Sequence, residues 1–150
     1  MDFVYTDGSD QDFVALCDLL DDSLNESAGG EKNRSQYIQY NTLNDIHDVI
    51  VVYKEKEPIG CASFKLYDTG IAEVKRVFIK KEYQGKGISK QLMSRLEEKA
   101  IEKGYRKLIL ETGVHLAAAN GLYRQIGYSV IENYGQYKGM KGSVCMEKIL

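Results

Sequence analysis

The residues best suited to chemistry form a glycine turn, Gln84, Gly85, Lys86 and Gly87, between a predicted strand and a predicted helix. The first N–H groups of a helix lack intrahelical partners, and the helix dipole adds partial positive charge there. Glycines also let an anion approach the backbone without meeting a Cβ atom. The turn therefore predicts a site for a pyrophosphate, although an ordinary strand-to-helix turn would explain the same glycines.

The elements on either side of this turn have clear patterns. Residues 72–80 carry β-forming side chains and predict a strand. The helix is expected to begin near Ile88 or Ser89, and Gly104 stands where a C-terminal cap belongs. Its apolar residues fall on one helical face: Ile88, Leu92, Met93, Leu96, Ala100 and Ile101.

Length and composition narrow the class of protein. The chain has 150 residues, which predicts a single domain over 1–150, and its formal charge of −2 argues against nucleic acid as a partner. No apolar run approaches a membrane span, and the acidic N-terminus lacks the regions of a signal peptide, so a cytoplasmic protein is expected. The three cysteines are interpreted as reduced core residues, and no metal site is expected.

The remaining elements are predicted from periodicity and turn residues. A short strand at 3–5 precedes a helix at 9–24, capped by Ser9, and a weaker helix at 34–43. Strands follow at 48–54, 59–67 and 71–80, then the helix after the turn, a strand at 107–112, a helix at 116–126 ended by Gly127, and strands at 128–132 and 143–149. Strands flanking a single helix are normally parallel.

Two motifs and this order of elements resemble the GNAT N-acetyltransferase superfamily. Gln84, Gly87 and Ser89 are similar to its phosphate-binding signature, with serine in place of the final glycine or alanine. The segment from Leu122 through Tyr123 to Tyr128 is similar to a second family segment. The resemblance covers essentially the whole chain and implies an α/β fold (a mixed α+β sheet, splayed at its centre) in the order β-α-α-β-β-β-α-β-α-β-β.

The resemblance implies acetyl-CoA as the acetyl donor and direct attack by an amine on the thioester. Its phosphates would meet the glycine turn and the helix start, and its pantetheine would pair with the strand before the turn, where an N–H would polarise the thioester carbonyl. Asn120 would substitute for a family asparagine that this chain lacks. The implied cofactor-binding residues are Val77, Phe78, Ile79, Gln84, Gly85, Lys86, Gly87, Ile88, Ser89 and Asn120.

Two residues match catalytic positions of the family. Glu73 lies at the spacing of a catalytic glutamate and would act as general base, with Glu111 or a chain of water molecules as the alternatives. Tyr123 matches the tyrosine that faces the CoA sulfur and would protonate the thiolate. An exposed strand position for Glu73 and a core position for Tyr123 are the structural alternatives.

Acceptor specificity is expected to reside in residues 25–34 and 133–142, and the predicted substrate-binding residues are Arg34, Arg76, Glu111 and Tyr137. The predicted function is acetylation of a primary amine of a small molecule, such as an amino acid or related metabolite. Acetylation of a protein or peptide, and a non-catalytic CoA-binding sensor, remain as alternatives. Edge strands near the C-terminus make a homodimer reasonable.

Overall fold

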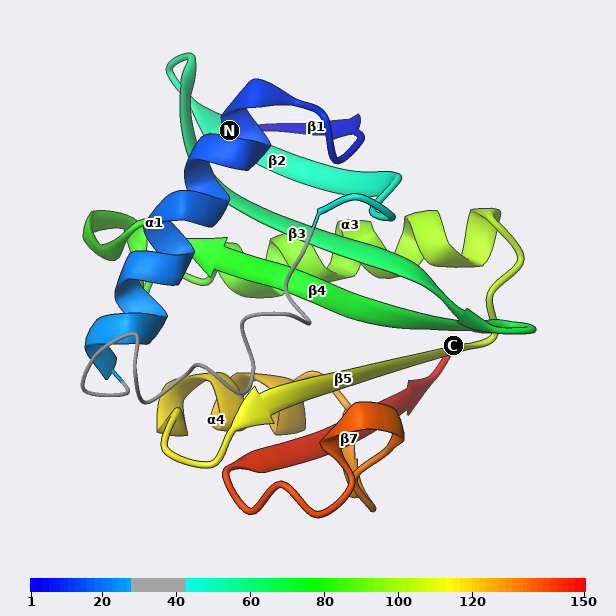
Figure 1. Cartoon of the computed structure of the whole chain (residues 1–150). Coiled ribbons are helices and arrows are strands. Elements are labelled where there is room, and N and C mark those ends of the chain that lie inside the picture. The colour runs from blue at the N-terminus through cyan, green and yellow to red at the C-terminus, as the bar shows by residue number, and fades with distance from the viewer. Residues whose placement is uncertain (28–42) are drawn as a thin grey trace. The chain divides into compact units, whose positions relative to one another are not determined.

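The computed structural model describes residues 1–27 and 43–150 and contains a seven-stranded mixed sheet with strand order β1-β2-β3-β4-β5-β7-β6 (Figure 1). The chain forms two compact units: unit 1 comprises residues 1–65 and 75–96, and unit 2 comprises residues 66–74 and 97–150. The strands are β1 (Asp2–Thr6), β2 (Asp48–Lys54), β3 (Glu57–Asp68), β4 (Ile71–Ile79), β5 (Lys107–Gly113), β6 (Ser129–Ile131) and β7 (Ser143–Ile149). The helices are α1 (Gln11–Ser27), α3 (Ile88–Glu102) and α4 (Ala117–Gln125), with short 3₁₀ turns η2 (Lys81–Tyr83) and η3 (Gly135–Tyr137).

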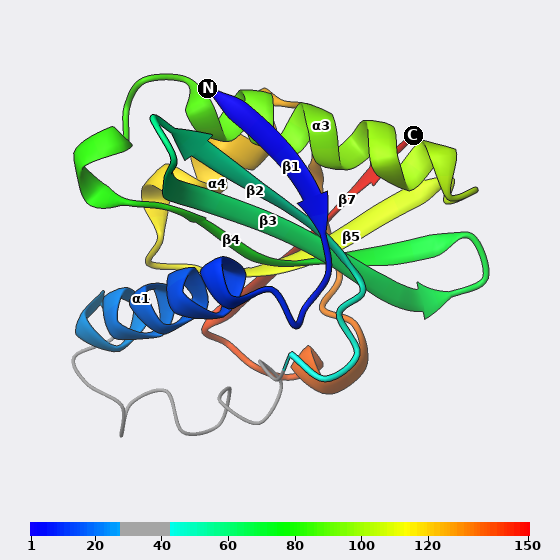
Figure 2. The same ribbon diagram turned by 90° about the horizontal axis from the view of Figure 1, so that it is seen from above.

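Unit 1 packs helices on both faces of its strands. The antiparallel ladders β1–β2 and β2–β3 form the sheet, with α1 on one face and the first part of α3 on the other (Figure 2). Helix α1 buries Phe13, Leu16 and Cys17 in one core cluster with β2 and β3 residues. The continuous apolar run of β2 is buried throughout, as predicted for a strand covered on both faces.

The start of α1 differs from the prediction. Asp10, not Ser9, caps the helix, since its Oδ1 accepts hydrogen bonds from the N–H groups of Asp12 (2.9 Å) and Phe13 (3.1 Å). Ser9 instead hydrogen-bonds to Asp7 through both its N–H and its hydroxyl. The helix therefore begins two residues later than the periodicity alone predicts.

Unit 2 contains the parallel pairing that was predicted across α3. Ile71, Ala72 and Glu73 of β4 pair with Lys107, Leu108 and Ile109 of β5, and the ladder ends there. Strand β7 then pairs antiparallel with both β5 and β6. Gly104 and Gly127 both have positive φ. The N–H of the residue after each glycine donates to a carbonyl in the last turn of the preceding helix: Tyr105 to Ala100, and Tyr128 to Tyr123. Both predicted C-terminal caps are therefore confirmed.

The buried face of α3 is as predicted, with one exception. Ile88, Leu92, Met93, Leu96 and Ala100 are at most 4% exposed, whereas Ile101 is 56% exposed. At 3.6 residues per turn, Ile101 falls outside the arc that the other five residues share, so its side chain is exposed and its predicted place on the buried face was wrong. All three cysteines are buried, which confirms their prediction as core residues.

The predicted helix at 34–43 lies outside the described residues, apart from Leu43, which is not helical.

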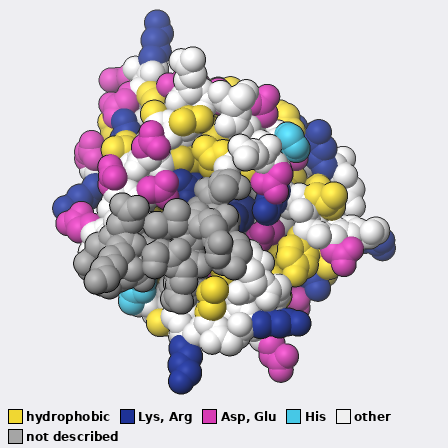
Figure 3. Space-filling view, viewed as in Figure 1, with side chains coloured by type: hydrophobic (Ala, Val, Ile, Leu, Met, Phe, Trp, Pro, Cys, Tyr) yellow, Lys and Arg dark blue, Asp and Glu magenta, His cyan; other side chains and the backbone are white. Residues whose placement is uncertain are grey.

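The surface of α1 is acidic. Acidic side chains gather over this helix in Figure 3. The acidic residues of α1 are Asp12, Asp18, Asp21, Asp22 and Glu26. A polyanion would be repelled from this surface. Among the described residues, no helix combines the length and the apolar character needed to cross a lipid bilayer.

Candidate active site

The glycine turn, where an anion cradle was predicted, lies in unit 1. Gly85 (φ 76°) and Gly87 (φ 77°) are both left-handed and exposed, and a Cβ atom built at either would meet no described atom within 4 Å. Helix α3 begins directly afterwards at Ile88, whose side chain is buried while its N–H belongs to the first turn. The turn therefore leaves open space in front of backbone donors, and it fits a pyrophosphate.

Side chains around the turn add support and positive charge. The Gln84 side chain donates to the Ile79 carbonyl (2.8 Å), which ties the turn to the end of β4. The ammonium groups of Lys86 and Lys54 each lie 5.7 Å from the centre of the Tyr83 ring. Sequence reasoning missed Lys54, because nothing in the sequence places the end of β2 beside η2.

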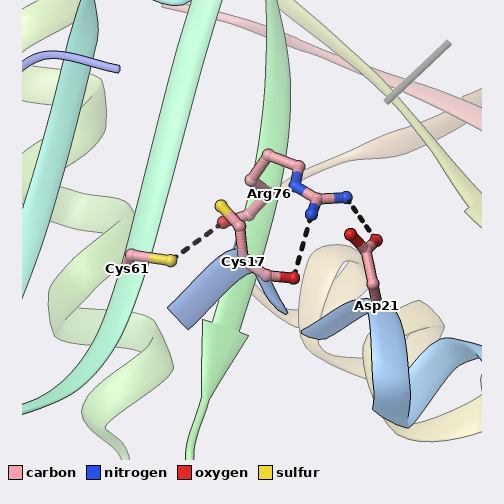
Figure 4. A network of polar contacts seen from close by, with 4 residues as sticks. All are labelled: Cys17, Asp21, Cys61 and Arg76. Atoms are coloured by element: carbon pink, nitrogen blue, oxygen red, sulfur yellow. Dashed lines mark hydrogen bonds and ion pairs between the residues drawn. The ribbon is translucent and has the colours of Figure 1, made fainter. Parts of the chain in front are cut away.

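Strand β4 contains an irregularity at Arg76, also in unit 1. Arg76 has φ 58°, a left-handed conformation that is rare for a residue with a side chain. Its guanidinium donates to Asp21 Oδ1 (2.9 Å) and to the Cys17 carbonyl (3.0 Å), and its own carbonyl accepts from the Cys61 thiol (3.3 Å), as Figure 4 shows. Side chain and backbone are thus both held by neighbouring elements, which stabilises the unusual backbone.

This irregularity bears on two predictions. The strict alternation of side chains expected over 73–79 is interrupted at Arg76, because a residue at φ 58° is not extended. Asp21 already pairs with the Arg76 guanidinium, and the Arg76 side chain is only 3% exposed, so a substrate carboxylate would have to compete for the predicted role of Arg76. Arg76 Nε is buried and lacks a hydrogen-bond partner within the described part of the chain.

Glu73, the predicted base, lies in unit 2 and is 2% exposed. Its Oε2 accepts a hydrogen bond of 2.6 Å from the Tyr134 hydroxyl. No lysine or arginine among the described residues forms an ion pair with Glu73. The exposed strand position considered for Glu73 is therefore not what the structure contains. Burial of a carboxyl group costs free energy, which makes Glu73 a candidate functional group.

Glu111 and Tyr137 belong to the same group of side chains in unit 2. Glu111 lies two residues after Ile109, the β5 partner of Glu73, so both carboxylates are on the same face of the sheet. Glu111 accepts a hydrogen bond of 2.7 Å from the Ser143 hydroxyl. Burial, followed by the charges of Glu111 and Glu73, raises the pKa of the Tyr137 phenol. Three predicted residues thus gather here, together with Tyr134, to which sequence reasoning assigned no catalytic part.

Tyr123, the predicted acid, is 7% exposed on α4. Its ring packs edge-on against Tyr128, with the ring centres 5.7 Å apart. The Tyr123 hydroxyl has no hydrogen-bond partner within the described residues, in contrast to the hydroxyls of Tyr53, Tyr128 and Tyr134. Burial raises the pKa of the Tyr123 phenol, so it stays protonated at neutral pH and keeps a proton available for a ligand.

The surroundings of Asn120 are partly structural. Its side-chain nitrogen donates to the carbonyls of Gly113 (3.0 Å) and Leu116 (2.7 Å), which leaves only its Oδ1 to contact a ligand. Gly121, the next residue, is exposed, and a Cβ atom there would meet no described atom within 4 Å. It lines a shallow open depression on α4 with Ala118, Leu122, Arg124 and Gln125. Tight helix packing therefore does not explain this glycine. Arg34 lies outside the described residues.

Comparison with known proteins gives one consistent family. The profile of the acetyltransferase (GNAT) family matches residues 13–128. The chain is 33% identical over 139 residues to the IAA acetyltransferase of Azospirillum brasilense, and the match covers 91% of this chain and 90% of that protein.

Solved structures of related shape agree with this match. A protein of Klebsiella pneumoniae assigned as an acyl-CoA N-acyltransferase has a TM-score of 0.79 at 28% identity, over 99% of this chain and 97% of that one. The PaiA N-acetyltransferase of Thermoplasma acidophilum, solved in complex with coenzyme A, has a TM-score of 0.75 at 22% identity, over 100% of each chain. The second likeness bears on the fold alone.

Proposed function

The chain belongs to the acetyltransferase (GNAT) family, and from that premise we propose that it transfers an acetyl group from acetyl-CoA directly to the primary amine of a small molecule, such as an amino acid or a related metabolite. It is an N-acetyltransferase and its cosubstrate is acetyl-CoA. The observation that carries the proposal is the pair of contrasting groups in unit 2, a buried carboxylate at Glu73 and a buried phenol at Tyr123 whose hydroxyl lacks a partner among the described residues.

Each end of the cosubstrate has a counterpart. The turn from Gln84 to Ser89 would hold the pyrophosphate through backbone N–H groups, with Lys86 and Lys54 adding charge. The backbone of Val77, Phe78 and Ile79 would pair with the pantetheine, and an N–H at the irregularity of β4 would donate to the thioester oxygen. Donors fixed before the reaction stabilise the developing oxyanion without reorganising.

The reaction then needs a base and an acid. An acceptor amine arrives mostly as an ammonium ion, and Glu73 takes one proton, directly or through a water molecule. The amine nitrogen attacks the carbonyl carbon, the C–N bond forms, and the C–S bond breaks as the nitrogen loses its second proton. The sulfur leaves as a thiolate and takes the proton of the Tyr123 hydroxyl. The second proton that the nitrogen loses then restores the Tyr123 hydroxyl. One ammonium and one thioester thus give an amide, a thiol and one proton.

A thiol-release assay on a panel of amines tests this proposal. The panel contains n-butylamine, glycine, L-lysine and a lysine peptide with a blocked N-terminus, and mass spectrometry identifies each product. We expect at least one small amine to be acetylated with a kcat/KM about 10-fold or more above that of the peptide. Acetylation of the peptide alone would contradict the small-molecule proposal.

Glu73→Gln tests the base on the same panel. The variant removes the proton acceptor while it keeps the size of the side chain, and we expect kcat to fall by about 10²-fold or more. Calorimetry should find acetyl-CoA binding unchanged, because the cradle lies elsewhere in the sequence. A normal kcat in this variant would show that Glu73 is not the base and that Glu111 or water takes the proton.

A further inference from the structure

The hydrogen bond between Tyr134 and Glu73 is the feature of unit 2 that the proposed reaction does not yet use. Tyr134 Oη donates to Glu73 Oε2 over 2.6 Å. The two residues are 61 positions apart, with Glu73 in β4 and Tyr134 in the segment between β6 and β7. The bond therefore joins the predicted base to a segment in which acceptor specificity is expected.

Tyr134 is held in place from two sides. Its ring packs edge-on against Tyr67, with centres 5.2 Å apart and planes at 77°, and against Tyr137, with centres 5.6 Å apart and planes at 89°. The backbone around it is fixed by Asn133, whose side-chain nitrogen donates to the carbonyls of Tyr137 (3.1 Å) and Met140 (3.0 Å). The hydroxyl thus has one defined position, and Glu73 accepts from it there.

The donor role of this phenol is unambiguous. Burial, followed by the Glu73 charge, raises the pKa of Tyr134, so the hydroxyl keeps its proton wherever Glu73 is ionised. The other titratable groups that interact electrostatically with this cluster are Glu111 on β5, Cys145 on β7 and Tyr137 on η3. Among the described side chains, Tyr134 is the one whose hydroxyl donates to Glu73.

We propose that Tyr134 is a positioning residue for acetyl transfer: its hydroxyl engages one oxygen of Glu73, fixes the plane of the carboxylate and leaves the other oxygen to take the proton of the acceptor ammonium. This rests on the proposed function, in which Glu73 is the base. Tyr134 itself exchanges no proton with the substrate.

Tyr134→Phe tests the proposal, because it keeps the ring between Tyr67 and Tyr137 and removes only the hydroxyl. With the best amine of the panel, we expect kcat to fall about 10-fold or more, with unchanged calorimetric affinity for acetyl-CoA. The loss should fall on kcat, with KM for the amine changed by less than about twofold, because the hydroxyl orients the base and does not bind the amine. Tyr67→Phe, in the same cluster but without a bond to Glu73, should leave both kcat and KM unchanged.

A double variant separates this proposal from the function on which it rests. In a Glu73→Gln background, Tyr134→Phe should cause no further loss of kcat, since no base remains to be positioned. An unchanged kcat in Tyr134→Phe, a loss that falls on KM alone, or an equal further loss in the double variant would overturn the positioning role. Failure of the proposed function would look different: the wild-type protein would release no thiol with any amine of the panel.

Discussion

Gly87→Ala should separate the binding of CoA from the stability of the fold. Gly87 has φ 77°, and an added Cβ atom would meet no described atom within 4 Å. The cost to folding is therefore only the left-handed backbone of an alanine, about 1 kcal/mol of unfolding free energy after the gain from a less flexible unfolded chain. That loss should lower the melting temperature by about 2–4 °C for a chain of this length.

The same Cβ atom should have a larger effect on CoA. It would extend into the space in front of the backbone donors, where the pyrophosphate is proposed to lie. Loss of one charge-assisted hydrogen bond there costs about 1.5–3 kcal/mol, so calorimetry should measure CoA binding weakened by about 10- to 100-fold.

The chain offers a matched control at the other end of α3. Gly104 has φ 91°, and a Cβ atom there also meets no described atom within 4 Å. Gly104→Ala should therefore lose about the same 1 kcal/mol of stability and bind CoA as tightly as the wild type. If the two variants bind CoA equally well, or lose affinity equally, the glycine turn is not the cradle.

Four further outcomes are expected. Tyr123→Phe should lower kcat by about 10²-fold or more with unchanged CoA affinity; an unchanged kcat would remove its role as acid. Arg76→Gly should be more stable to denaturant than Arg76→Ala by about 1 kcal/mol, because φ 58° favours glycine, and the reverse order would contradict this. Gly121→Ala should raise the unfolding free energy by about 0.5–1 kcal/mol, and a lower melting temperature would show a hidden clash. Burial raises the folded-state pKa of Tyr123 and Tyr128, so their contribution to stability is complete below the unfolded pKa of about 10 and is lost as pH rises above it. Stability that stays constant from about pH 9 to about pH 11 would contradict the last of these.

Most of the fold follows from local patterns. The apolar spacing of α3, the continuous run of β2 and the glycines after α3 and α4 each report on a few adjacent residues, and each was predicted correctly. The cap of α1 was wrong because Ser9 and Asp10 are both good caps, and only the path of the chain decides which oxygen reaches the free N–H groups. Sequence periodicity does not determine the backbone conformation of the residues that precede the helix.

The parts of the site that lie within one short sequence motif could be predicted, whereas contacts between residues far apart in the sequence could not. The turn at Gly85 and Gly87 is local, and the glycines that predicted it both have positive φ. The left-handed conformation of Arg76 depends on Asp21, 55 residues away, and arginine itself gives no sign of it. The bond from Tyr134 to Glu73 depends on the register of β4 and on the segment before β7, which neither residue type reveals.

The three buried cysteines allow the opening of each unit to be followed separately. Cys17 and Cys61 lie in unit 1 and Cys145 lies in unit 2, and each is at most 1% exposed. A thiol-alkylating reagent can therefore modify each sulfur only when the surrounding unit opens transiently. Peptide mapping after timed alkylation would give the opening rate of each unit in one sample, with no engineered probe. The same experiment with CoA added would measure which unit the cosubstrate holds closed.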